Sequence, residues 1–328
     1  MHRAGLVSIM FLAQAGAVWV NKTETQASEP LRIFMCVTGQ SGRLETGSKI
    51  EKFLKVNHDK GHIIDVAAVL DHRDHPRFVN QLHVGEEDPH AVRISSFKPY
   101  TRYIRDVKFH QPDEPEVPAR YKENIMQDHK PNVDPNDRAR NHVRQFTAIQ
   151  RCYDEMRDLE FLAGEKYDEI LRIRDDAYIL APMTLISEMK EEKRPDILTN
   201  HCDNWDGLND KAVLMPRSSA ETYFKGFLKE LYLNGPRDAF VKNPETLTFS
   251  FLTHEGMNIM QSGMDMPVTC LRGSVTDGSG CLHMRTMNCW KQLFDDMHFD
   301  VKREASLPWC EEDVEIDYQE NPDKLPHQ

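Results

Sequence analysis

Short apolar runs alternate with turns and amphipathic segments along most of the chain. Residues 31–38 and 63–70 are continuous apolar runs, which is typical of parallel strands that are covered on both faces. A glycine-containing turn follows the first run, and residues 49–56 then show helical spacing. The first 70 residues therefore predict a strand, a turn, a helix and a second strand.

The same alternation continues beyond residue 138. In residues 139–163 apolar side chains recur every three to four positions, and Gly164 follows as a glycine C-cap would. The other expected elements are strands at 167–173, 197–199, 212–215 and 267–271, and helices at 183–189, 218–233 and 244–257, the last capped by Asn243. This order predicts an α/β, Rossmann-like fold with a mostly parallel central sheet and a mixed C-terminal half.

Two segments depart from the alternation. Residues 76–135 are rich in His, Asp, Glu and Pro and have weak periodicity, so we expect an irregular insertion there. Residues 311–328 read as an acidic tail. We therefore expect one domain over residues 31–310, interrupted by the insertion.

The N-terminus carries the longest apolar segment. Residues 5–20 would span about 24 Å as a helix, short of the roughly 30 Å hydrocarbon core. A signal peptide, cleaved near Ala13-Gln14-Ala15, and a short signal anchor both fit this length; a buried first element is the third interpretation. Under either targeting interpretation residues 1–30 form the leader and stem, and the Asn21 glycosylation sequon is lumenal.

Composition and charge exclude several classes of protein. The 328 residues are 39% hydrophobic and 29% charged, which is globular rather than disordered. With 41 Lys plus Arg against 53 Asp plus Glu, the net charge of −12 argues against a nucleic-acid-coating protein but allows a small basic pocket. The seven cysteines form no CxxC pair, which disfavours a structural zinc site. Four of them fall in the last 60 residues, so a C-terminal disulfide is open in an oxidising compartment.

The sharpest chemical feature is the acidic pair Asp175-Asp176 at the end of an expected strand, preceded by Arg172 and Arg174. Ligands of open α/β sheets bind beyond the carboxyl ends of strands. Carboxylates there suit Mg²⁺ or Mn²⁺ with a bound diphosphate, and the arginines could offset the diphosphate charge. An Arg–Asp ion-pair cluster without a ligand is the alternative interpretation.

Three weaker features accompany this pair. The turn Gly39-Gln40-Ser41-Gly42-Arg43 lacks the spacing of a dinucleotide or P-loop motif, but its glycines would allow a ligand close to the backbone. The polar loop at residues 202–211 is either a site loop or ordinary turn chemistry. Glu245 lies in the first turn of an expected helix, where the helix dipole favours a carboxylate; a capping role is the alternative.

The order and spacing of these motifs resemble an uncharacterised group of GT-A-like glycosyltransferases, related to WavE-type lipopolysaccharide-synthesis proteins and to plant and protist domains of unknown function. The resemblance covers residues 31–272. It is carried by Val37-Thr38-Gly39-Gln40 with Arg43, Ile64-Asp65-Val66 with Leu70-Asp71, Asn141 with Gln145 and Arg151-Cys152, Tyr167-Asp168 with Leu171 to Asp176, Trp205 to Lys211, and Pro244-Glu245 with Leu247 and Leu252.

The resemblance implies a nucleotide-sugar donor held by Mn²⁺ or Mg²⁺ and a glycan or other hydroxyl acceptor. It implies Asp176, and after it Asp175, as metal ligands, although Arg174-Asp175-Asp176 departs from a strict DxD motif. It implies Glu245 as the base that deprotonates the acceptor, with Asp210 as the competing candidate. The residues implied in holding the nucleotide are Gly39, Gln40, Arg43, Asp71, Arg172, Arg174 and Asn209.

The resemblance thus predicts a glycosyltransferase, and the N-terminal segment predicts that it lies in the secretory pathway, in the Golgi lumen as a type II membrane or secreted protein, anchored through residues 5–20 if they are not cleaved. Inversion and retention at the sugar carbon both stay open. The alternative is a non-catalytic module that binds a nucleotide sugar or a glycan. A phosphotransferase or nucleotidyltransferase is a third interpretation, because strand-end carboxylates serve those reactions too.

Overall fold

The computed structural model describes residues 29–71, 90–109, 114–127, 134–273, 282–284, 289 and 296–297. Its strands are β1 (Arg32–Gln40), β2 (Ile63–Asp71), β3 (Tyr103–Lys108), β4 (Glu169–Arg174), β5 (Ala177–Ile179), β6 (Ile197–Thr199), β7 (Ala212–Pro216), β8 (Ile259–Gln261), β9 (Val268–Gly273) and β10 (Leu282–Met284). Its α-helices are α1 (Gly47–Lys49), α2 (Lys55–Asp59), α3 (His90–Ser95), α4 (Ala119–Gln127), α5 (Pro135–Ala163), α6 (Ala220–Leu233) and α7 (Pro244–His254). A π-helical segment, Ile50–Leu54, joins α1 to α2.

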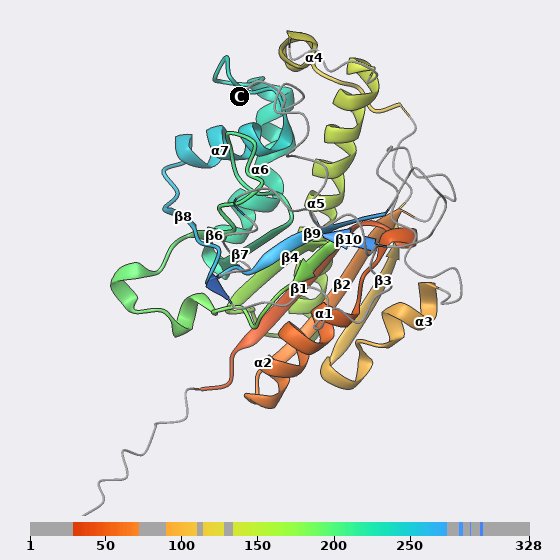
Figure 1. Ribbon diagram of the computed structural model, residues 1–328, viewed down its shortest axis with the longest axis vertical. Helices are drawn as coiled ribbons and strands as arrows, with labels where there is room; N and C mark the ends of the chain where they lie inside the picture. Colours follow the sequence, from red (N-terminus) through yellow and green to blue (C-terminus); the bar gives the residue numbers. More distant parts are fainter. Residues whose placement is uncertain are drawn as a thin grey trace, which may run out of the picture.

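The central sheet has seven strands in the order β3-β2-β1-β4-β7-β6-β8 (Figure 1). Strands β3, β2, β1 and β4 are mutually parallel, β7 runs antiparallel to both of its neighbours, and β6 is parallel to β8. A smaller sheet has the order β10-β9-β5. The predicted α/β class with a mostly parallel sheet and a mixed C-terminal half is confirmed.

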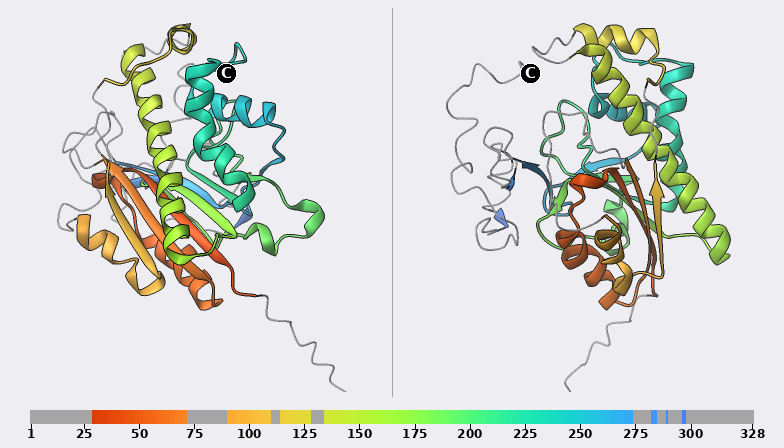
Figure 2. Two further views of the ribbon diagram at one scale, coloured as in Figure 1. Left: turned by 180° about the vertical axis from the view of Figure 1, so that it is seen from behind. Right: turned by 90° about the vertical axis from the view of Figure 1, so that its right-hand side faces the viewer.

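Strand β1 shows why its sequence is apolar throughout. Phe34 and Cys36 face the layer formed by α5, α6 and α7, whereas Ile33 and Met35 face the π-helical segment and the smaller sheet. Figure 2 shows the sheet edge-on between these two layers. A disulfide between Cys36 and Cys152 links β1 to α5 across 116 residues.

Most predicted elements are present with boundaries shifted by a few residues. Gly164 adopts φ +70 and caps α5, and the Asn243 side chain accepts a hydrogen bond from the Thr246 N–H at the start of α7. The helix expected at 183–189 is wrong, because only the 3₁₀ turn Ile186–Glu188 forms. The Glu169 carboxylate there accepts the N–H groups of Ile186 and Ser187 at 3.0 and 2.7 Å.

The expected irregular insertion is wrong in part. Its apolar cluster forms β3, which extends the parallel sheet beside β2, and α3 and α4 also lie within it. Strand β3 is the outermost strand of the sheet, and its side chains are half-buried or exposed.

The predicted N-terminal segment, the Asn21 sequon and the acidic tail lie outside the described residues. Across the part of the chain that the structure does describe, no helix has both the length and the apolar character needed to cross a bilayer.

Candidate functional site

The acidic pair lies where the sequence predicts it, at the carboxyl end of β4. Asp175 and Asp176 form the turn that carries the chain from β4 in the large sheet to β5 in the small one. The carboxyl end of β1 is adjacent, since Thr38 pairs with Arg174. The loop that precedes β7 reaches the same edge, because the Lys211 carbonyl accepts the Arg174 N–H at 2.8 Å.

Asp175 binds the glycine turn that follows β1. Its carboxylate accepts the Gln40 N–H at 2.8 Å and both Nε and Nη2 of Arg43 at 2.8 and 3.0 Å. Gly39 has φ +141, and a Cβ there would lie 2.0 Å from Asp175 Oδ1. The glycine is therefore required by the close approach of this carboxylate, and three of the predicted nucleotide-binding residues converge on Asp175.

Asp176 and Asp210 share a second arginine. Arg174 Nε and Nη2 donate to Asp176 at 2.9 and 2.7 Å, and Arg174 Nη1 donates to Asp210 Oδ2 at 2.9 Å. Gln145 Nε2 and the Lys211 ammonium also donate to Asp210. Arg43 Nη1 lies 3.5 Å from Asp176. We call the resulting series of contacts, Asp175–Arg43–Asp176–Arg174–Asp210–Lys211, the charge chain.

The charge chain keeps Asp176 and Asp210 ionised, whereas burial outweighs the charge of Arg43 at Asp175 and raises the pKa of that carboxyl. Burial raises the pKa of Asp176, but the charges of Arg174 and Arg43 outweigh it and leave this pKa below its usual value. Burial acts on Asp210 in the same sense, and Arg174 and Lys211 hold its pKa well below the ordinary range.

A buried lysine that sequence reasoning missed fixes the turn. Lys49 in α1 is fully buried, and its ammonium donates to the Ala177 carbonyl at 2.6 Å and the Asp175 carbonyl at 3.2 Å. Its nearest carboxylate oxygen, on Glu45, is 3.4 Å away. Lys49 precedes the buried Phe53 by four residues, so helical spacing places both on one face; a lysine on an apolar face was the available signal.

The loop between β6 and β7 has an unusual backbone. Asp203, Trp205 and Asp206 all have positive φ, at 57, 48 and 65, a region that non-glycine residues seldom adopt. The Asn209 side chain bonds within the loop, donating to the Cys202 carbonyl at 2.5 Å and accepting the Lys211 N–H at 2.7 Å. Asn209 is buried, and its amide thus holds the loop that presents Asp210.

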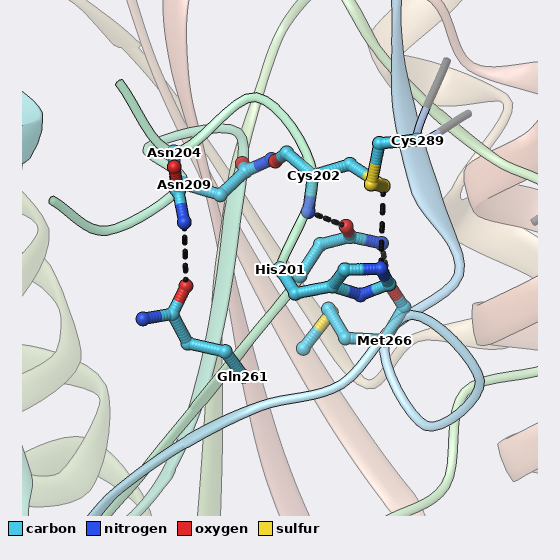
Figure 3. The surroundings of a disulfide bond; sticks show 8 residues. His201, Cys202, Asn204, Asn209, Gln261, Met266 and Cys289 are labelled. Atoms are coloured by element: carbon cyan, nitrogen blue, oxygen red, sulfur yellow. Dashed lines mark hydrogen bonds between the residues drawn. A yellow bond between two sulfur atoms is a disulfide. The ribbon is translucent and has the colours of Figure 1, made fainter. Parts of the chain in front are cut away.

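A disulfide between Cys202 and Cys289 ties this loop to a distant part of the sequence (Figure 3). His201 Nε2 lies 3.6 Å from Cys202 Sγ. His201, Cys202 and Cys289 are the described His, Cys, Asp and Glu side chains that come close enough to share a metal ion, but the two sulfur atoms are bonded to each other. The pairing had been left open by the sequence.

Glu245 differs from the other acidic groups of the site. It lies in the first turn of α7, packed against the loop: a Cβ on Gly207 would lie 2.2 Å from the Glu245 carbonyl carbon, and the Leu208 N–H donates to the Glu245 carbonyl at 3.1 Å. Within the described residues no guanidinium donates to its carboxylate. Burial, followed by the charge of Asp210, raises the pKa of Glu245 to about 7, against the opposing charge of Lys211. The other ionisable groups that face it are Asp203 and the Tyr121 hydroxyl of α4.

The remaining predicted residues lie at the same edge. Asp71 ends β2 opposite Gln40 and is buried. Arg172 is buried in β4, where its guanidinium donates to the Asp210 carbonyl. The structure thus gathers the predicted site residues at the carboxyl end of the parallel strands.

The carboxylates do not fit a divalent cation as they stand. Mg²⁺ requires oxygen donors at about 2.0–2.1 Å in near-octahedral geometry, but both oxygens of Asp175 and of Asp176 already accept hydrogen bonds from arginines. Asp175, Asp176 and Asp210 also do not form a group in which all three could reach one ion, among the residues the structure covers. Metal binding by Asp176 and Asp175 stays a prediction that these contacts do not favour.

No protein-family model matches the chain, and no curated protein matches it either. The function must therefore be argued from the site.

Proposed function

We propose that the protein is a glycosyltransferase that moves a sugar from a nucleotide-sugar donor to a hydroxyl acceptor. The observation that carries the proposal is Glu245, a buried carboxyl with a pKa of about 7 beside Lys211 of the charge chain. A base with a pKa near the working pH is efficient, and fixed cations stabilise a departing diphosphate. The α/β sheet, with its site beyond the strand ends, agrees with the GT-A-like resemblance.

In the proposed reaction the bond between the sugar C1 and the phosphate oxygen breaks, and its electron pair leaves with the diphosphate. The acceptor oxygen forms the new bond to C1, and Glu245 takes the hydroxyl proton. Asp210 is the weaker candidate for this base, because Arg174 and Lys211 bind its carboxylate and lower its pKa. No step in this sequence passes through a metal ion.

The disulfides Cys36–Cys152 and Cys202–Cys289 support the secretory-pathway part of the proposal, since disulfides persist in oxidising compartments. Placement in the Golgi lumen and anchoring through residues 5–20 remain proposals on the sequence alone.

A non-catalytic module that binds a nucleotide sugar is the second candidate. Complete pairing of Asp175 and Asp176 with arginines favours it, because such carboxylates can serve a rigid binding site. Calorimetry with a panel of nucleotide sugars, with and without Mn²⁺, followed by a donor-hydrolysis and transfer assay, separates the two. Donor binding without turnover supports the module.

Replacing Glu245 with Gln tests the proposed base. We expect kcat to fall by about 10²–10⁴-fold with little change in donor affinity, because the amide removes proton acceptance and keeps the shape. Glu221→Gln is a matched control, since Glu221 is also a first-turn glutamate but lies at the exposed start of α6. A wild-type kcat in Glu245→Gln would show that another group is the base.

A further inference from the structure

The charge chain alternates strictly in sign. Arg43 lies between Asp175 and Asp176, at 2.8 and 3.5 Å, and Arg174 lies between Asp176 and Asp210, at 2.7 and 2.9 Å. Each guanidinium therefore bridges two carboxylates. A side chain with two anionic partners is held in one orientation, so the planes of both guanidinium groups are fixed before any ligand arrives.

The two arginines of the charge chain lie nearer to solvent than its carboxylates. The Arg174 and Arg43 side chains are 20% and 12% exposed, whereas those of Asp175, Asp176 and Asp210 are 0%, 5% and 8% exposed. A ligand that approaches this edge of the sheet meets guanidinium groups before it meets carboxylates.

This arrangement suits an anion rather than a cation. A divalent cation at Asp176 would have to displace Arg174 and would lie beside Arg43, whose positive charge repels it. A phosphate is instead attracted by the charge of both guanidinium groups, which stay in place because Nε and Nη2 of each donate to Asp175 or Asp176.

We propose that Arg43 and Arg174 bind the diphosphate of the nucleotide directly, with no divalent cation between protein and phosphate. Asp175 and Asp176 are positioning residues that orient the two guanidinium groups. The nucleotide as ligand rests on the proposed function, but recognition of a diphosphate by the arginines does not.

Calorimetric titration of the full-length protein with inorganic pyrophosphate tests this directly. The titration is run once in EDTA after removal of metals and once in Mn²⁺. We expect binding in EDTA that changes less than threefold on addition of Mn²⁺ and weakens steeply with salt. Arg174→Gln should weaken it by about tenfold or more, and Arg174→Lys, which keeps the charge but loses the bidentate contact with Asp176, should lie between.

Arg217→Gln is the matched control. Arg217 also binds a carboxylate in bidentate geometry, that of Glu160, at 2.6 and 2.9 Å, but it follows β7 at the opposite edge of the sheet. The Arg217→Gln variant should leave pyrophosphate affinity unchanged.

Asp176→Asn should weaken pyrophosphate binding equally in EDTA and in Mn²⁺, as expected for a residue that acts through Arg174.

Each other result has a distinct meaning. Binding that requires Mn²⁺ and is lost in Asp176→Asn overturns the inference and leaves the glycosyltransferase proposal intact. Absence of pyrophosphate binding under both conditions also overturns it. Metal-free pyrophosphate binding that depends on Arg174, without hydrolysis or transfer of any sugar in the donor panel, supports the inference and contradicts the proposed function.

Discussion

The two ends of the parallel strands bury carboxylates in different settings. At the amino end, Asp65 accepts hydrogen bonds from one guanidinium, that of Arg102, and from the neutral Tyr167 hydroxyl and Tyr103 N–H. At the carboxyl end, Arg43 and Arg174 are each shared between two carboxylates.

The carboxyl end also holds Glu245, which lacks a guanidinium partner in the described part of the chain and titrates near pH 7. A carboxylate with its own arginine and hydrogen-bond donors stabilises the fold. A set of shared ion pairs beside a titratable carboxyl is suited to bind an anion and to move a proton. The two ends therefore differ in partner number: Asp65 has one arginine, whose side chain is 31% exposed, whereas each arginine of the carboxyl end is shared between two carboxylates.

The largest effect on stability should come from Asp65→Ala at the amino end. It leaves the buried Tyr167 hydroxyl without its acceptor and removes the hydrogen bonds from Arg102, whose side chain is 31% exposed. Hydrogen bonds to a charged group contribute about 1.5–3 kcal/mol each, so the free energy of unfolding should fall by more than about 3 kcal/mol. Urea unfolding measures the loss. Glu51→Ala, which breaks the exposed pair with Lys55, should cost less than about 1 kcal/mol. If Asp65→Ala changes pyrophosphate affinity per folded molecule, the two edges are not independent.

At high pH Glu245→Gln should raise the free energy of unfolding, which is the opposite of the effect of Asp65→Ala. The unfolded chain binds this proton up to about pH 4.5 and the folded chain up to about pH 7, so the free energy of unfolding falls as pH rises between these values. The loss, complete above pH 7, is on the order of 3 kcal/mol. We expect the Gln variant to flatten this part of the pH profile and to be more stable than wild type at pH 8.

Urea unfolding at several pH values between 4.5 and 8 gives this profile. Glu221→Gln serves as the control again, because Glu221 is exposed and its variant should follow the wild-type curve. A Gln variant of Glu245 that is less stable than wild type at pH 8 would contradict the raised pKa and, with it, the contrast between the two edges.

The sequence predicts the parts of the site that depend on local pattern. The strand that ends at Arg174, the turn of Asp175 and Asp176, and the capped start of α7 before Glu245 all follow from apolar runs and capping residues. The partners do not, because Arg43 and Asp175 are 132 residues apart and nothing in local spacing pairs them. The same holds for Cys202 with Cys289 and for β3, whose sheet partner lies across a polar segment.

The smallest effect tests whether the amino end is only structural. Tyr167→Phe removes a 2.8 Å hydrogen bond to Asp65 and leaves the Arg102 pair in place, so the free energy of unfolding should fall by about 1 kcal/mol. Burial and the charge of Asp65 raise the pKa of Tyr167 above its usual value, so this loss should be constant from pH 5 to pH 9, unlike the pH-dependent change in Glu245→Gln. Urea unfolding across that range measures it. Burial also shifts the pKa of His62 downwards and that of Glu169 upwards at this end. A loss that varies with pH would mean that the Tyr167–Asp65 pair is coupled to one of these groups, and the distinction between a structural and a functional end would then have to rest on anion binding alone.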